Sequence, residues 1–143
     1  MSVIVAKRKE GRFEVLLRAE ELCAYTIRIC KNEKNFPKRD RWILTQPIVN
    51  EALAAMTCIR RGNAVRVVQQ SDYEYRRSQQ VEAFAHLEAL LSLIEIAYNV
   101  LSIESKRIEF WTGLVLGVEE KLRGWRRSDR EGWRASQKGD SGQ

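Results

Sequence analysis

The chain has 143 residues, of which 44% are hydrophobic and 31% are charged, the balance of one soluble globular domain with a single core. Its 25 Lys and Arg residues, most of them Arg, outnumber 19 Asp and Glu residues and give a net charge of +6, which indicates either an acidic partner, with nucleic acid first, or a merely basic soluble surface. The three cysteines cannot all pair, no secretory leader precedes them, and the longest uncharged run is far below the roughly 20 residues that cross a bilayer, so we expect a cytoplasmic protein with reduced thiols.

The first predicted helix covers about residues 13–32. Its expected core face has apolar residues at spacings of three and four: Phe13, Leu16, Leu17, Cys23, Ala24, Ile27 and Cys30. We interpret Cys23 and Cys30 as small core residues, because a metal site needs more ligands than His86 could add to them.

A proline-punctuated, arginine-rich segment, FPKRDRWIL, follows this helix. Pro37 has no amide hydrogen and pushes Phe36 towards extended geometry, so the first helix must end before it. We expect Phe36 to fold back as an apolar plug over the end of the bundle. The three cations of this segment should then face water: Lys38, Arg39 and Arg41.

The second helix is predicted to begin either near Asp40, acting as an N-cap, or only at 45–46. The later start would put Pro47 in a tolerated first-turn position. The inward row is Leu44, Ile48, Ala52, Ala55 and Ile59. Gly62 and the Asn after it are a stop signal, and the segment 64–70 could extend the helix, form a short extended stretch or cross the end of the bundle.

The third helix should begin at about 71–72 and is apolar around most of its circumference. One row alternates at three and four residues: Phe84, Leu87, Leu91, Ile94, Tyr98 and Leu101. A second row widens this face: Ala83, Leu90, Leu93, Ala97 and Val100. So broad a face must be covered, either by another subunit, which we favour, or by Trp42 and the 64–70 segment.

Ser102 is expected to cap a fourth helix with a heptad core row of Ile108, Trp111, Val115, Val118, Leu122 and Trp125. Gly113 and Gly117 lie on one side of it, and each costs about 1 kcal/mol relative to Ala in a helix interior. Close backbone approach would offset that cost, either within the core or at a second interface contact.

Gly124 is the predicted C-terminal stop of this helix, with Trp125 folding back as a lid. Residues 128–143 are polar and lack periodicity, so we expect a disordered tail in which Trp133 is a lone anchor.

These elements predict an all-α fold, an up-and-down antiparallel four-helix bundle over residues 1–127, since short connections force neighbouring helices to be antiparallel. Cationic residues then gather at one end: Lys7, Arg8, Lys9, Arg12, Arg60, Arg61, Arg66, Arg123, Arg126 and Arg127. The predicted nucleic-acid contacts are Arg60, Arg61, Arg66, Arg123, Arg126 and Arg127, with a second patch at Lys38, Arg39 and Arg41. An acidic stripe on the third helix is the expected contact for a basic protein partner: Glu82, Glu88 and Glu95.

Catalytic motifs are not found in the sequence. His86 is the only histidine, and its place beside the apolar rows favours a partly buried structural role. The sequence has no Gly-rich phosphate loop, no zinc-binding histidine motif and no nucleophile elbow. We therefore expect no enzyme activity, no cofactor and no metal.

The segment FPKRDRWIL and the later Gly124–Trp125 pair resemble the Avd-like four-helix-bundle family. This family includes the accessory variability proteins of diversity-generating retroelements and the proteins encoded in 23S ribosomal RNA intervening sequences. The intervening-sequence proteins end their second helix with small residues, whereas this chain has TCIRRG at 57–62. That difference and the basic helix ends favour the accessory variability branch.

The resemblance implies a basic pentamer that binds a reverse transcriptase and its template RNA without chemistry of its own. Because two basic proteins repel one another, either RNA or the acidic stripe would have to mediate the contact with the reverse transcriptase. A different class of function also fits a helical bundle: a protein-only adaptor, such as the partner of a minimal nucleotidyltransferase in a toxin–antitoxin pair. Neighbouring genes would separate the two.

Overall fold

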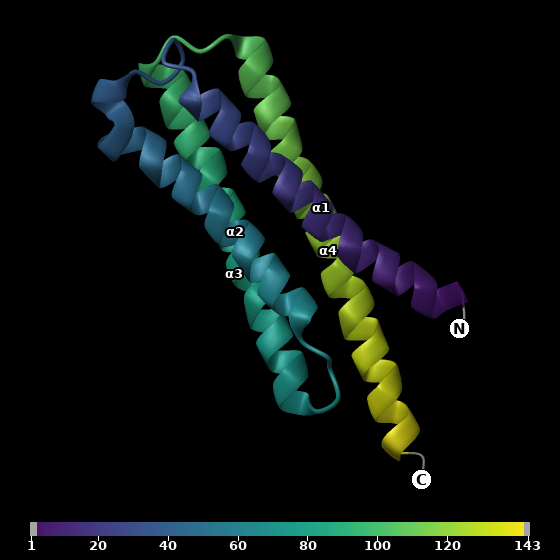
Figure 1. Cartoon of the computed structure of the whole chain (residues 1–143). Coiled ribbons are helices and arrows are strands. Elements are labelled where there is room, and N and C mark those ends of the chain that lie inside the picture. The colour runs from purple at the N-terminus through teal and green to yellow at the C-terminus, as the bar shows by residue number, and fades with distance from the viewer. Residues whose placement is uncertain (1–2, 142–143) are drawn as a thin grey trace.

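The computed structural model describes the backbone of residues 3–141 and the side chains of residues 11–139. It contains four long helices, α1 (Val3–Lys31), α2 (Gln46–Ala64), α3 (Gln70–Val100) and α4 (Ser105–Ser141), and no strand in this range. Consecutive helices run in opposite directions (Figure 1), and each packs against its neighbours in the cyclic order α1, α2, α3, α4. The predicted all-α, up-and-down four-helix bundle is therefore confirmed. None of the described helices is both long enough and apolar enough to span a bilayer.

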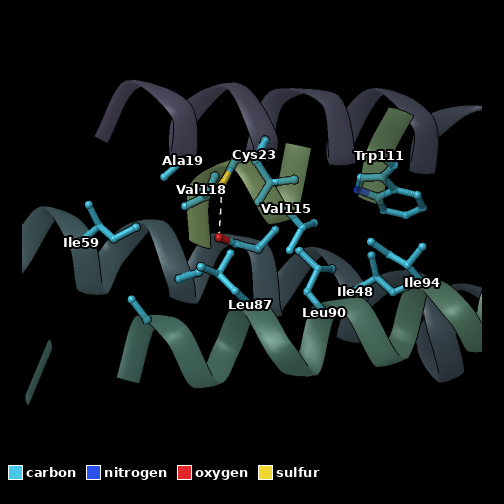
Figure 2. Packing of buried hydrophobic residues seen from close by; sticks show 14 of the residues in the cluster. Ala19, Cys23, Ile48, Ile59, Leu87, Leu90, Ile94, Trp111, Val115 and Val118 are labelled. Atoms are coloured by element: carbon cyan, nitrogen blue, oxygen red, sulfur yellow. Dashed lines mark hydrogen bonds between the residues drawn. The ribbon is translucent and has the colours of Figure 1, made fainter. Parts of the chain in front are cut away.

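The core lies along the middle of the bundle, where all four helices contribute buried side chains (Figure 2). The predicted rows of α2 and α4 are confirmed at most positions, with Ile48 and Ile59 of α2 and Val115 and Val118 of α4 fully buried. Trp111 is also fully buried, and its indole Nε1 donates a hydrogen bond to Thr26 Oγ1 at 3.0 Å. This bond satisfies the one polar atom of a large core side chain.

The predicted core faces of α1 and α3 are partly wrong. Phe13 and Leu17 are 60% and 47% exposed, whereas Val15, Ala19 and Leu22 of α1 are buried. In α3 the fully or nearly fully buried row is Ala83, Leu87, Leu90, Ile94 and Ala97, and the predicted core residues Tyr98 and Val100 are exposed. In both helices the apolar residues span more of the circumference than the core covers, so the pattern alone does not determine the buried side.

The connection between α1 and α2 contains the predicted plug. Phe36 is 3% exposed and meets Trp111 edge-on, with ring centroids 6.0 Å apart. A short 3₁₀ turn and a π-helical turn then lead into α2, which begins at Gln46 with Pro47 in its first turn. The later of the two predicted starts is therefore correct, and Asp40 makes no side-chain capping hydrogen bond.

The connection between α2 and α3 is a short non-helical segment, and the next helix begins with a capping box. Asp72 Oδ2 accepts hydrogen bonds from the backbone N–H groups of Val68 and Gln69 at 3.1 and 3.0 Å. These bonds favour the carboxylate and lower the pKa of Asp72. The start of α3 is thus fixed one residue before the predicted range.

The predicted end of α4 at Gly124 is wrong, because the helix starts at Ser105 and continues to Ser141. Residues 128–141, for which the sequence predicts a disordered tail, are therefore helical; 142–143 lie outside the described residues. Trp125 is buried within the helix, and the extension beyond it contacts α3. A glycine weakens a helix by only about 1 kcal/mol, which tertiary contacts on both sides can offset.

The expected close approach at Gly113 and Gly117 is also absent within the described chain, because a Cβ added at either would meet no atom within 4 Å. The tightly packed glycine is Gly62 at the end of α2. A Cβ there would lie 3.0 Å from Cη2 of Trp125. The hydrogen atom in place of a side chain at Gly62 lets α4 approach α2 at this level.

Candidate nucleic-acid interface

Five arginines from two helices line one surface pocket of about 210 Å³, which we call the arginine groove: Arg77, Arg123, Arg126, Arg127 and Arg130. Arg77 comes from α3 and the other four come from α4. The α4 positions are spaced by three, one and three residues, which puts them on one face of a helix. Since α3 packs beside α4, Arg77 closes the groove from the other side.

The groove concentrates positive charge without an ion-paired carboxylate among the described residues. None of its five arginines forms an ion pair within 4.0 Å in the described part of the chain. Arg126 Nε is buried and has no hydrogen-bond partner among the described residues. Burial first, and then repulsion by Arg77 and Arg130, lowers the pKa of Arg126. Such a site favours an anion that would satisfy these donors.

Aromatic side chains border the groove at both of its ends. Arg123 lies over the ring of Phe84, with Cζ 5.3 Å from the centroid, a cation–π contact. Towards the C-terminus of α4, Tyr73 and Trp133 stack with centroids 5.2 Å apart and planes tilted by only 8°. Arginine and aromatic groups thus follow one another along the α3–α4 face.

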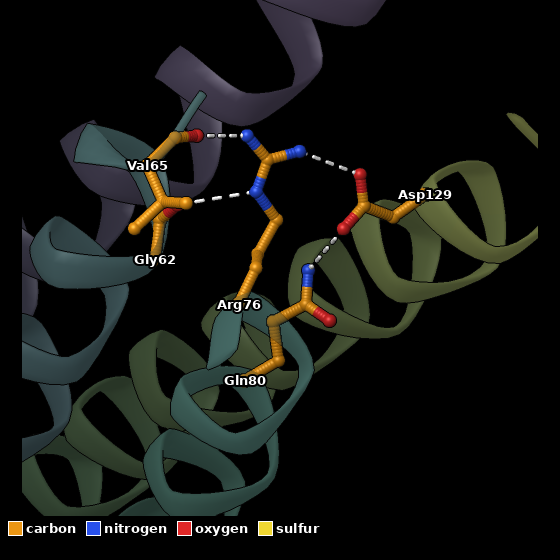
Figure 3. Close-up of polar contacts among 5 residues, drawn as sticks. All are labelled: Gly62, Val65, Arg76, Gln80 and Asp129. Atoms are coloured by element: carbon orange, nitrogen blue, oxygen red, sulfur yellow. Dashed lines mark hydrogen bonds and ion pairs between the residues drawn. The ribbon is translucent and has the colours of Figure 1, made fainter. Parts of the chain in front are cut away.

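A buried clamp holds the C-terminal part of α4 against α2 and α3 (Figure 3). Arg76 Nη1 pairs with Asp129 Oδ1 at 2.8 Å, and Arg76 also donates hydrogen bonds to the carbonyl oxygens of Gly62 and Val65. Gln80 Nε2 donates to the other oxygen of Asp129 at 3.3 Å. Because all these partners are internal, Arg76 fixes the position of the groove and does not contribute to it.

The predicted basic end divides into separate surfaces. Arg123, Arg126 and Arg127 line the groove, whereas Arg60, Arg61 and Arg66 are exposed at the end of α2 and do not. Burial first, and then Glu82 of α3, raises the pKa of the Cys58 thiol, and the positive charge of Arg61 opposes this shift. Arg12 is partly buried, and the side chains of Lys7, Arg8 and Lys9 lie outside the described residues.

Lys38, Arg39 and Arg41 lie at the opposite end of the bundle from the groove, in the connection before α2 (Figure 1). All three are exposed, and Lys38 Nζ lies 3.5 Å from Glu33 Oε1. Sequence reasoning missed Arg77 and Arg130. The spacing of Arg130 from Arg126 and Arg127 was the available signal, and the assumed stop at Gly124 hid it.

The predicted acidic stripe is not one surface. Glu82 Oε2 lies 3.9 Å from Cys58 Sγ of α2. Glu88 instead faces α4, where its charge adds to the effect of burial in raising the pKa of Glu119. Six residues separate these glutamates, or one and two-thirds helical turns, so they point towards different neighbouring helices. Glu95 is exposed and follows Glu88 by seven residues, or about two turns, towards the end of α3.

Glu119 itself is a buried carboxyl group at 1% exposure, and its Oε2 has no hydrogen-bond partner within the described chain. Burial first, and then the charge of Glu88, raises the pKa of Glu119 to about 7, while Arg123 opposes the shift. This acid stands beside the groove without lining it.

The remaining reactive side chains have structural surroundings. His86 Nδ1 lies 2.6 Å from Glu51 Oε2 of α2, in line with a partly buried structural histidine. The three cysteines are free and buried, and burial raises the pKa of Cys23 to about 11 and that of Cys30 to about 12. Among the described residues, no three His, Cys, Asp or Glu side chains are grouped so that they could hold a metal ion.

Comparison with known proteins gives no assignment. A scan against family models finds no match, and searches of curated proteins and of solved structures find no similar chain. The arginine groove is therefore the strongest structural guide to function.

Proposed function

We propose that the chain binds the sugar–phosphate backbone of nucleic acid through the arginine groove. The observation that carries this proposal is the meeting of five guanidinium groups at one pocket where none has an ion-pair partner among the described side chains. Guanidinium groups match phosphate oxygens with paired, charge-assisted hydrogen bonds. A phosphodiester would also relieve the mutual repulsion of Arg77, Arg126 and Arg130.

A polyanion suits this site better than one small anion. The groove arginines on α4 extend from Arg123 to Arg130, about 10 Å along the helix axis at 1.5 Å per residue. That length offers contacts to successive phosphates of one strand, and the net charge of +6 adds a long-range attraction. The exposed Arg60, Arg61 and Arg66 provide a separate basic surface at the end of α2, and the second patch before α2 provides a further one.

Binding of this kind is sequence-independent and involves no catalysis. Backbone phosphates carry no base information, and the groove supplies donors without a paired acceptor. Binding should weaken steeply between about 50 and 200 mM salt, because each phosphate contact releases counterions.

The resemblance to the Avd-like family extends the proposal to a biological setting. In that setting the chain is an accessory variability protein of a diversity-generating retroelement, a homo-oligomer that holds template RNA and contacts a reverse transcriptase. The helical bundle and the basic α3–α4 face support this extension. A pull-down of a co-expressed reverse transcriptase after nuclease treatment tests whether the protein contact needs RNA, and loss of binding by the double variant Glu88→Lys/Glu95→Lys would assign a role to those two glutamates.

The direct test compares three double variants that each remove two positive charges. Arg126→Gln/Arg130→Gln changes the groove, Arg60→Gln/Arg61→Gln changes the end of α2, and Lys38→Gln/Arg39→Gln changes the opposite end. Filter binding to labelled single-stranded RNA and duplex DNA should show the largest loss for the groove variant, on the order of tenfold or more at moderate salt. Equal losses in all three would mean that net charge alone acts, and no binding by the wild type would remove the proposal.

A further inference from the structure

A second pocket adjoins the arginine groove and has a different character. It has a volume of about 340 Å³, and three aromatic rings line it, so we call it the aromatic pocket: Tyr73, Trp125 and Trp133. Val67 and Val68 add apolar surface, and Val68 is 71% exposed. The volume lies within the range of about 300–1,000 Å³ that is typical of small-ligand sites.

The aromatic pocket approaches the groove through two of its rings, whereas Asp129 and Gly132 of its lining lie on another side of α4 from the groove arginines. Tyr73 precedes Arg77 by four residues on α3, and Trp133 follows Arg130 by three on α4, so each ring lies one turn from a groove arginine. Arg126 interacts electrostatically with Tyr73 as well as with Arg77. A single ligand that occupies the groove can therefore reach the aromatic pocket.

The linings of the two sites decide which part of such a ligand enters each. Asp129 and Arg76 line the aromatic pocket as an ion pair, and Arg12 is the third charged residue there, so a phosphate meets fewer positive charges in the aromatic pocket than in the groove. The rings favour a flat, neutral group that can stack, while the hydroxyls of Ser128 and Ser136 can bond to its polar edge. The groove favours the negatively charged phosphates of the ligand, since it is lined by five arginines.

We propose that the aromatic pocket receives an unpaired base of a single-stranded nucleic acid whose phosphates lie in the arginine groove. This inference rests on the proposed function and narrows its substrate class. Bases in a duplex are stacked on one another and paired, so they cannot enter the pocket without unstacking. The chain should therefore prefer single strands to duplexes, a discrimination that the arginines alone do not provide.

The experiment measures fluorescence anisotropy with two labelled probes, an oligouridylate of roughly 20 nucleotides and a duplex DNA of the same length, a span that covers one binding site. Trp133→Leu should weaken binding of the oligouridylate roughly tenfold, as loss of one stacked base does, and should change duplex binding less than about twofold. Trp133→Phe keeps an aromatic face and should retain most of the single-strand affinity. Circular dichroism of each variant checks that α4 stays helical.

Photo-crosslinking with an oligonucleotide that contains 5-iodouridine supplies a readout that a purely structural role would not produce. The crosslinked peptide should contain Trp133 or Tyr73. Parallel loss of single-strand and duplex binding in Trp133→Leu, or no loss of either, would overturn the base pocket and leave the backbone proposal standing. Absence of binding to both probes by the wild type would instead remove the proposed function, and the inference with it.

Discussion

Arg76 of α3 and Asp129 of α4 form an ion pair with a 2.8 Å separation between Nη1 and Oδ1, and their side chains are only 5% and 14% exposed. Asp129 lies five residues beyond Gly124, so this pair joins the second half of α4 to the bundle. Arg76 also bonds to the carbonyl oxygens that end α2, which links three elements through one guanidinium. The arginine groove and the aromatic pocket both depend on this position of α4.

Removing one partner of the pair should destabilise the protein strongly. Asp129→Ala leaves the buried Arg76 charge without its counter-ion, and loss of one partner of such a pair lowers the free energy of unfolding by about 3–5 kcal/mol. Urea unfolding followed by circular dichroism measures the change. Glu131→Ala is the matched control, because Glu131 is exposed on the same helix turn and its loss should cost less than about 0.5 kcal/mol. Similar effects of the two variants would contradict a clamp role for Asp129.

The two kinds of helix glycine should respond to alanine in opposite directions. Gly62→Ala places a Cβ 3.0 Å from Trp125 and should lower the free energy of unfolding by about 1–3 kcal/mol, since the packed indole must move. Gly113→Ala meets no described atom within 4 Å and should raise it by about 1 kcal/mol through helix propensity. Thermal unfolding at low protein concentration compares them, and stabilisation by Gly62→Ala would show that the contact is loose.

The buried sides of α2 and α4 could be predicted from the sequence, because the predicted inward residues of each of these two helices form a single, narrow row. Ile48 and Ile59 in α2, and Trp111 and Val115 in α4, are buried as the pattern predicts. In α1 and α3 the apolar residues span too much of the helix for periodicity to select a side. Leu22 is buried and Leu17 is exposed because of where the neighbouring helices pack against α1. The sequence of α1 alone does not contain this information.

Part of the candidate site could be predicted in the same way. Arg126 and Arg127 are one turn from Arg123 and Arg130, so their common face follows from helical spacing alone once the helix is known to continue. Local propensity at Gly124 argued for a stop, and the long-range pair between Arg76 and Asp129 overrides it. The contribution of Arg77 depends on the packing of α3 against α4, which spacing within one helix cannot show.

Glu119 should make the stability of the protein depend on pH near neutrality. Its pKa is raised from 4.5 to about 7 in the folded state, so between these values the folded protein binds more protons than the unfolded chain. The free energy of unfolding therefore falls as the pH rises towards 7, and the contribution of this proton is lost above that pH.

Glu119→Gln should remove this dependence. The amide cannot ionise, so the variant should be more stable than the wild type at about pH 8, by on the order of 1–3 kcal/mol, and the two should converge at about pH 5. Urea unfolding across this pH range measures the difference. Glu120→Gln is the control, because Glu120 is exposed beside it. An identical pH dependence in wild type and Glu119→Gln would assign the effect to other groups.

Self-association is the last prediction, and two surfaces compete for it. Gly113 and Gly117 leave an open strip on α4 beside Phe110, which is 57% exposed, and α3 exposes Ile96 at 48%. We expect a closed homo-oligomer, with five subunits implied by the resemblance and more than one by the exposed apolar groups. Sedimentation equilibrium at micromolar concentration measures the mass.

The variants separate the two surfaces. Gly113→Gln inserts a bulky polar group where the folded monomer has free space, so it should dissociate an oligomer built on α4 while leaving circular dichroism unchanged. Ile96→Ser should do the same if α3 supplies the contact, since it removes apolar area without disturbing a buried residue. Wild-type protein that sediments as a monomer would exclude both surfaces. An oligomer that survives both variants would direct attention to Phe13 and Leu17 of α1, which are 60% and 47% exposed.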